Sequence, residues 1–218
     1  AGTVSNWDKL KDDMLQNEVP QWYVESCEKI KYMFPKAHAA AYVMMSWRIA
    51  YCKIYYPLAY YCAFFSIRSK AFDYEKMCLG RENLDRNIRE LREKEASGKE
   101  KMSATEAVLL KDLRIVQEFY ARGYEFMKLD IMRAKANRFQ IIDGKIMPSF
   151  MSIDGIGANA AIQMEQAAKD GPYTSVRNFM DRAKVSQTHV EFMKKYHILP
   201  DDMPNDDQLD FMSLLMAE

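Results

Sequence analysis

The sequence predicts a mainly α protein with one short β-hairpin. Three observations lead to this class: apolar residues recur at helical spacing along most of the chain, several segments carry helix start or stop signals, and only one segment combines strand-forming residues with a tight turn. The chain has 218 residues, of which 49% are hydrophobic. This is enough to bury a sizeable core, and it excludes a globally disordered chain.

Four helices are expected in the first third of the chain. The first covers Trp7–Asn17 and is stopped by Val19-Pro20, and the second covers 23–33. The third is the alanine-rich segment 37–51, whose apolar face is so broad that we expect the helix to be mostly buried. Pro57 ends it, and a fourth, aromatic-rich helix covers 58–67.

Two further helices are expected between residues 81 and 122. Leu84, Ile88 and Leu91 form one narrow apolar stripe among arginines and glutamates, which indicates a mostly solvated helix over 81–95. Ser103 and Glu106 have the spacing of a capping box, which predicts the start of a helix that runs to Arg122 and stops at Gly123.

Residues 139–147 give the strongest strand signal. Phe139–Ile142 and Lys145–Met147 flank an Asp143-Gly144 pair, the dipeptide that favours the turn of a two-residue hairpin.

The charges balance overall but are unevenly distributed. The 31 basic and 31 acidic residues give a net charge of zero, which excludes a uniformly basic nucleic-acid coat. Residues 29–70 nevertheless contain basic residues and no acidic ones, whereas residues 200–218 contain acidic residues and no Lys or Arg.

Cysteine usage and hydropathy favour a cytoplasmic protein. The four cysteines, at 27, 52, 62 and 78, have no zinc-binding spacing, and we expect reduced thiols. No secretory leader is expected, because the first ten residues carry charge and no apolar run. The longest uncharged apolar stretch, 54–67, is too short for a membrane span, so no membrane partner is expected.

A glycine motif at 152–161 points to nucleic acid. Ser152–Ala161 resembles the helix-hairpin-helix pattern. Gly155 and Gly157 permit positive φ and a close backbone approach, and Ile156 is the expected core anchor. The amides that follow, at Ala158 and Asn159, open a helix whose N-terminus can bind a phosphate without reading base sequence. The alternative is an ordinary glycine turn before a helix.

Residues 181–187 resemble a degraded second copy of this motif. Val185 keeps the apolar anchor, but Lys184 stands where the first glycine would be. A structural role, in which the two hairpins pack as one unit, is the expected one, with a direct DNA contact as the alternative.

Lys36 and His38 stand at the start of the alanine-rich helix. Cationic groups there oppose the helix dipole, which is expected where an anionic ligand such as a triphosphate binds. A solvated lysine and a packed histidine form the alternative, and residue chemistry alone favours that alternative.

The run Phe34–Tyr42 and its flanks resemble the fingers region of PolC-type DNA polymerase III alpha subunits of low-GC Gram-positive bacteria. The resemblance covers nearly the whole chain, as the C-terminal part of a longer polypeptide. It implies a fingers region over 1–130, a helix-hairpin-helix duplex-binding domain over 131–200 and an acidic tail over 201–218.

The resemblance also implies site residues. Contacts to the incoming dNTP are implied for Lys36, His38 and Tyr42, with Lys31 and Arg48 as weaker candidates. Contacts to duplex DNA are implied for the hairpin residues, which are Gly155, Ile156, Gly157, Ala158 and Asn159.

The C-terminal tail resembles the family's peptide for binding the sliding clamp. Gln208 can hydrogen-bond a pocket rim, while Leu209, Phe211 and Met212 can fill an apolar groove. Phe211 replaces the family's usual Leu and Met212 its usual Phe, and the preceding acidic residues are expected to keep the tail mobile. The alternative is an acidic disordered end.

The chain has no Asp-x-Asp pair of the kind that holds two catalytic metals. Asp12-Asp13, Asp201-Asp202 and Asp206-Asp207 are adjacent pairs and are expected to be solvated. No cofactor is expected in this chain, and Mg²⁺ is expected in the complete polymerase, bound by its palm.

The sequence therefore predicts a non-catalytic polymerase fragment that binds dNTP, duplex DNA, the sliding clamp and the remainder of the polymerase. The alternative is a free-standing adaptor that binds DNA and the clamp without a nucleotide site.

Overall fold

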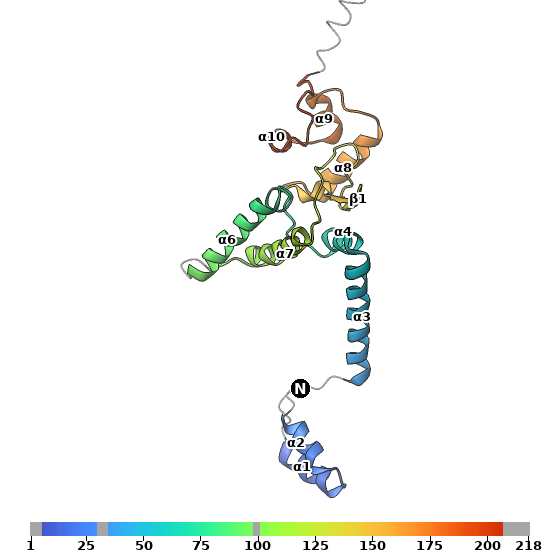
Figure 1. Ribbon diagram of the computed structural model, residues 1–218, viewed down its shortest axis with the longest axis vertical. Helices are drawn as coiled ribbons and strands as arrows, with labels where there is room; N and C mark the ends of the chain where they lie inside the picture. Colours follow the sequence, from blue (N-terminus) through green and yellow to red (C-terminus); the bar gives the residue numbers. More distant parts are fainter. Residues whose placement is uncertain (1–5, 30–34, 98–100, 207–218) are drawn as a thin grey trace, which may run out of the picture. The chain divides into compact units, whose positions relative to one another are not determined.

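The computed structural model describes residues 6–29, 35–97 and 101–206 and confirms a mainly α fold with one short β-hairpin (Figure 1). The elements in chain order are α1 (Trp7–Gln16), α2 (Gln21–Lys29), α3 (Lys36–Tyr55), α4 (Pro57–Ile67), α5 (Tyr74–Met77), α6 (Arg81–Ser97), α7 (Ala104–Ala121), β1 (Gln140–Ile142), β2 (Lys145–Met147), the 3₁₀ helix η1 (Phe150–Ser152), α8 (Ala158–Lys169), α9 (Val176–Ala183) and α10 (Gln187–Lys195). The part of the second expected helix that falls on 30–33 lies outside the described residues.

The chain divides into two compact units, Ala1–Tyr51 and Cys52–Glu218. In the first unit, α1 and α2 lie against each other. Lys11 and Glu28 form an ion pair between them at 3.5 Å, and the side chain of Val24 is fully buried. The predicted domain boundaries at 130 and 200 rest on the family resemblance and stay predictions.

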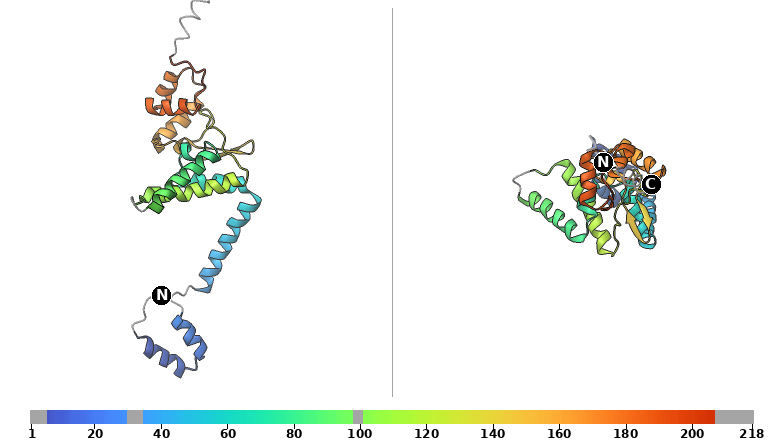
Figure 2. Two further views of the ribbon diagram at one scale, coloured as in Figure 1. Left: turned by 60° about the vertical axis from the view of Figure 1, so that its left-hand side comes forward. Right: turned by 90° about the horizontal axis from the view of Figure 1, so that it is seen from above.

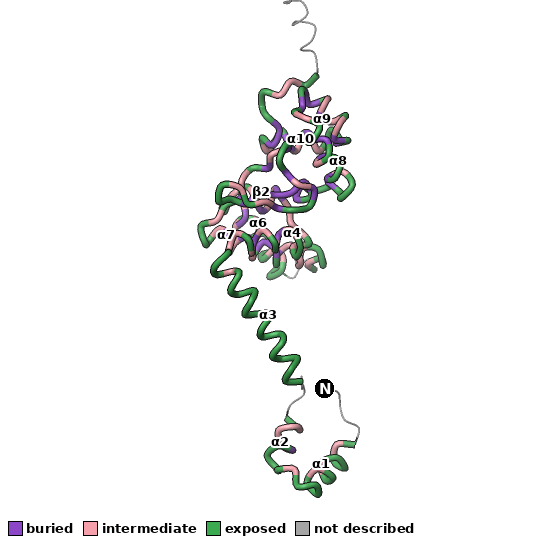
Figure 3. Tube along the Cα trace, turned by 90° about the vertical axis from the view of Figure 1, so that its right-hand side faces the viewer, coloured by how far each residue is buried: buried purple, intermediate pink, exposed green. Residues whose placement is uncertain are grey.

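Helix α3 differs from its prediction. The expected burial is wrong for this chain, because α3 has no buried residue (Figure 3). Trp47, on this helix, is 76% exposed. Its apolar side chains are spread around all sides of the helix, so they define no single face that a neighbouring element of the described chain could cover.

The first core of the second unit lies among α4, α6, α7 and the β-hairpin. The ring of Phe65 from α4 contacts the rings of Phe119, Phe126 and Phe139, with centroids 5.8, 5.4 and 5.8 Å away. Helices α6 and α7 pack together (Figure 2), and α6 buries Leu84 and Ile88, two residues of its predicted stripe. Aromatic contacts of this kind add to the burial of apolar surface.

Local signals placed the elements of this core correctly. Pro57 is the first residue of α4, where its missing N–H costs nothing. The predicted capping box is present, with the Ser103 hydroxyl accepting from the Glu106 amide and the Glu106 carboxylate accepting from the Ser103 amide. In the β-hairpin, Asp143 and Gly144 have φ of 50° and 75°, as an Asp-Gly turn requires.

The second core lies among α8, α9 and α10 and the segments that lead into them. It contains Phe150, Ile156, Met164, Phe179 and Met193, together with Tyr74 from α5. Tyr74 therefore links this helical group to the rest of the second unit. Among the described helices, none has both the length and the apolarity that crossing a membrane requires.

Candidate nucleic-acid interface

The glycine motif forms a tight bend between η1 and α8. Gly155 has φ of +80°, so it adopts the left-handed conformation that glycine permits. Ile156 is 6% exposed and anchors the bend in the second core, as predicted. Gly157 is the N-cap of α8 with φ of −77°, so it does not use the positive φ that glycine permits.

The two glycines also differ in their surroundings. A Cβ at Gly155 would lie 2.9 Å from Nε2 of His189, whereas a Cβ at Gly157 would meet no atom within 4 Å. His189 belongs to α10, and its Nδ1 lies 2.8 Å from the Ser186 hydroxyl. A Cβ at Gly155 would therefore force the His189 side chain to shift, whereas Gly157 leaves open space in front of α8.

The first turn of α8 is accessible. Gly157, Ala158 and Asn159 are exposed, and no side chain caps the helix at Gly157. The first amides of a helix have no partner within it, so these groups can donate to an anion that approaches over Gly157.

The degraded copy has the backbone of the first motif. Lys184 has φ of 55°, Val185 is 7% exposed, and Ser186 is the N-cap of α10. These residues repeat the order of left-handed residue, buried anchor and N-cap. Both anchors lie in the same core, so the expected packing of the two hairpins as one unit is confirmed.

The N-terminus of α9 is occupied by the chain itself. The amides of Val176 and Arg177 donate to the carbonyls of Pro204 and Asn205, at 2.8 and 3.1 Å. The Lys194 ammonium donates to the Asn205 side chain at 2.6 Å. No local sequence signal predicts this return of the chain, because the partners are far apart along it.

The residues implied for nucleotide binding are exposed on α3. Lys36 is its first residue, and the rings of His38 and Tyr42 lie 4.5 Å apart between centroids. Arg48 lies about 9 Å further along the helix axis than Tyr42, at 1.5 Å per residue. Lys31 lies outside the described residues.

The implied clamp-binding residues, which are Gln208, Leu209, Phe211 and Met212, lie outside the described residues. The segment before them is attached to the second unit through Pro204 and Asn205, and Asp206 lies 3.7 Å from the Arg177 guanidinium. The expected mobility of the acidic tail stays a prediction.

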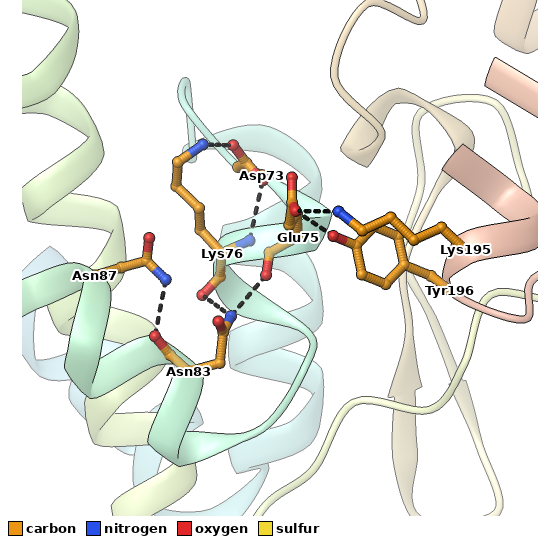
Figure 4. A network of polar contacts seen from close by, with 7 residues as sticks. All are labelled: Asp73, Glu75, Lys76, Asn83, Asn87, Lys195 and Tyr196. Atoms are coloured by element: carbon orange, nitrogen blue, oxygen red, sulfur yellow. Dashed lines mark hydrogen bonds and ion pairs between the residues drawn. The ribbon is translucent and has the colours of Figure 1, made fainter. Parts of the chain in front are cut away.

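A polar network joins the end of α10 to α5 (Figure 4). The Glu75 carboxylate accepts hydrogen bonds from the Tyr196 hydroxyl and from the Lys195 ammonium, which is 3.2 Å away. The Tyr196 hydrogen bond, followed by Lys195, lowers the pKa of the Glu75 carboxyl, against the effect of its partial burial. The network holds the end of α10 to the short helix α5.

The acidic side chains do not form a metal site in the described chain. Across the described ranges, no group of three His, Cys, Asp or Glu side chains is arranged to hold an ion. The described residues therefore do not fit the paired metals of a polymerase centre.

Comparison with known proteins agrees with this geometry. Residues 123–204 match a family model described as the helix-hairpin-helix motif. The match includes both bends and the helices that follow them. The fold and the site thus define a helix-hairpin-helix domain over residues 123–204.

The similar proteins are considerably longer. The chain is 46% identical over 196 residues to the PolC-type DNA polymerase III of Streptococcus pneumoniae serotype 2 (strain D39), which covers 90% of the chain and 13% of that protein. It is 41% identical to the proteins of the same name from Streptococcus agalactiae serotype III (strain NEM316) and Lactococcus lactis subsp. lactis (strain IL1403), each over 93% of the chain and over 14% and 12% of the relative. The chain belongs to the PolC-type DNA polymerase III family, as the counterpart of one segment.

Proposed function

We propose that this chain is the segment of a replicative DNA polymerase that holds duplex DNA and helps to position the incoming nucleotide. The observation that supports DNA binding most directly is the bend at Gly155–Gly157, which presents the uncapped first turn of α8 to solvent. Phosphates of the DNA backbone accept hydrogen bonds from such amides. These contacts to backbone phosphates do not depend on base sequence, as a replicative enzyme requires.

The proposed nucleotide-binding surface is the N-terminal part of α3. Lys36 supplies a cation for a triphosphate, and the paired rings of His38 and Tyr42 supply a stacking surface for a base or sugar. All three residues are exposed, so a nucleotide can reach them. The phosphoryl-transfer chemistry is assigned to other parts of the complete polymerase.

The remainder of the polymerase is the proposed partner of α3. Tyr42, Met45, Trp47 and Ile49 are each more than half exposed, so apolar side chains surround the helix. A solvated helix normally has a polar face. The relatives are several times longer than this chain, and their additional segments supply chain that can cover the apolar sides of α3.

The tail is the proposed contact with a sliding clamp. Gln208, Leu209, Phe211 and Met212 combine a hydrogen-bonding group with apolar anchors, as in peptides that dock into apolar grooves. Fluorescence anisotropy of a labelled 204–218 peptide titrated with clamp tests this contact. We expect Phe211→Ala to weaken it at least tenfold, and equal binding of both peptides contradicts the assignment.

Gly157→Val tests the duplex-binding role. A valine at φ of −77° fits the backbone, and its side chain would occupy the open space in front of α8. We expect duplex affinity at low salt to fall about tenfold while the circular dichroism spectrum is unchanged. Gln166→Val, at an exposed position later on α8, is the matched control and should bind normally. Equal affinities for the Gly157→Val variant and the unaltered chain would refute the role.

Chemical protection of Lys36 tests the nucleotide role. In the presence of the rest of the polymerase, primed DNA and dNTP, we expect acylation of Lys36 to slow at least fivefold, with no change at Lys111, an exposed lysine of α7. His38 is followed in the same way with a histidine-specific reagent. Protection of residues 208–212 by the clamp, with none at Lys36 or His38, would favour a free-standing adaptor instead.

A further inference from the structure

The loop that precedes the β-hairpin is the most cationic segment near the α8 bend. Residues 128–138 contain Lys128, Arg133, Lys135 and Arg138 against a single acidic residue, Asp130. We propose that Arg133 and Arg138 form a second row of contacts to the phosphates of duplex DNA, continuous with the bend at Gly155–Gly157. This inference rests on the duplex-binding role proposed above.

Hydrogen bonds fix the loop beside the glycine bend. The amides of Phe150 and Met151, in η1, donate to the carbonyls of Lys135 and Ala136, both at 3.0 Å. The Ala136 amide in turn donates to the Glu165 carboxylate of α8 at 2.7 Å. The loop is therefore bound on one side to the segment that leads into the bend and on the other to the helix that leaves it.

Two charged side chains of the loop, Lys135 and Asp130, have polar partners within the chain. The Lys135 ammonium lies 3.4 Å from the Glu165 carboxylate, and Asp130 accepts a hydrogen bond from the Met132 amide within the loop. Arg133 and Arg138 are exposed, and over the described ranges neither guanidinium lies within ion-pair distance of a carboxylate. Two positive charges on a fixed loop are thus available to an external anion.

The backbone is held in place at Arg133 and next to Arg138, where the Phe139 amide donates to the Ser66 hydroxyl at 2.9 Å. The Gln140 side chain donates to the Arg133 carbonyl at 2.8 Å, and the Arg133 amide donates to the Asp130 carbonyl at 3.1 Å. A guanidinium whose backbone is fixed loses less freedom on binding, and its planar donors match two phosphate oxygens at once. Because the α8 bend supplies neutral amides, the arginines would add most of the salt-dependent part of the affinity.

The test compares the full chain with two double variants that remove equal charge. Arg133→Gln/Arg138→Gln removes the proposed contacts, and Arg89→Gln/Arg92→Gln removes two exposed arginines of α6 as the matched control. Affinity for short duplexes of unrelated sequence is measured between about 50 and about 200 mM salt. For the loop variant, the slope of log affinity against log salt should flatten by about 1.8, at about 0.9 per lost phosphate contact.

Each outcome separates this inference from the role on which it rests. A flatter slope for the loop variant alone, equal for all sequences, supports the second row of contacts. An unchanged slope, or equal flattening in the α6 control, overturns it. If the loop variant binds normally while Gly157→Val binds weakly, only this inference fails. If Gly157→Val also binds normally, the duplex-binding role itself fails.

Discussion

Gly155 and Gly157 show how two identical residues, two positions apart, meet different physical demands. Gly155 combines a left-handed backbone with the close approach of the His189 ring. Gly157 has neither constraint, and its value lies in the absence of a side chain in front of the α8 amides. Gly155 therefore matters for stability, and Gly157 matters for binding.

Gly155→Ala should therefore destabilise the protein, whereas Gly157→Ala should not. At φ of +80°, alanine costs about 1–2 kcal/mol, and its Cβ would also displace the His189 ring from its position. At Gly157 the change is limited to helix capping, under about 1 kcal/mol. Urea unfolding followed by circular dichroism measures both values. A larger loss for Gly157→Ala than for Gly155→Ala would contradict this division.

The glycine pattern predicted the bend, but it did not predict which glycine adopts the left-handed conformation. Glycine is permissive, so sequence alone states what its backbone can adopt and not what neighbouring elements require. The contact between His189 and Gly155 joins segments more than thirty residues apart, and no local signal announces it. The buried anchors Ile156 and Val185 were predictable, because their apolar character between polar neighbours already implies burial.

At the scale of elements, an ion pair between α6 and α7 supports the capping box. The Lys94 ammonium donates to the Glu106 carboxylate at 2.8 Å, and this hydrogen bond, together with those from Ser103, lowers the pKa of the Glu106 carboxyl to about 2. Because the folded-state pKa is lowered, the stabilisation is present above the ordinary range of a glutamate and is lost as pH falls through about 2.

Lys94→Met should raise the pKa of Glu106, because it removes the largest of the interactions that favour the carboxylate. An NMR titration of the glutamate side chains measures this shift directly. Lys111→Met, on the exposed side of α7, removes one charge from the same helix pair and should leave the pKa of Glu106 nearly unchanged. Equal shifts in the two variants would show that the direct contact is unimportant.

Glu75 gives a second pH-dependent junction, between α5 and the end of α10. Its lowered pKa means that the interaction stabilises the fold above about pH 4.3, the ordinary pKa of a glutamate, and is lost as pH falls through the lower folded-state pKa. Tyr196→Phe should cost less than about 1 kcal/mol at neutral pH, since the Glu75 side chain is 47% exposed and screened by solvent.

The difference between Tyr196→Phe and the unaltered chain should shrink as the solution is acidified, as measured by urea unfolding at a series of pH values. Glu75→Gln is the control, because its amide cannot titrate, and its stability should respond less to acid than that of the unaltered chain. A difference that is constant over the whole acid range would exclude the carboxylate as its source.

Most elements were predictable because their signals are local. Pro57, the Ser103–Glu106 spacing and the Asp143-Gly144 pair each act within one turn of chain. The burial of α3 was not predictable in this way, because composition indicates that a helix needs covering but not which chain covers it. The nucleotide-binding assignment likewise rests on family resemblance, since spacing alone favoured a solvated lysine at residue 36.

At the scale of the molecule, both apolar cores lie in the second unit. Their buried members fall between Tyr61 and Leu199, whereas Val24 is the single buried residue among the described part of the first unit. Apolar burial is the main source of folding free energy, so the two units should contribute very unequally to stability.

Removal of residues 1–51 should therefore leave the cooperative unfolding of the protein intact. We expect the truncated chain to unfold in urea at the same midpoint as the full chain, within error, when the signal comes from tyrosines of the second unit. In a Trp7→Phe/Trp22→Phe variant of the full chain, Trp47, which is 76% exposed, should show solvent-like fluorescence before and after unfolding. A lower midpoint after truncation would show that the first unit adds to the stability of the second, and a blue-shifted Trp47 emission in the native chain would contradict the exposure of this side chain.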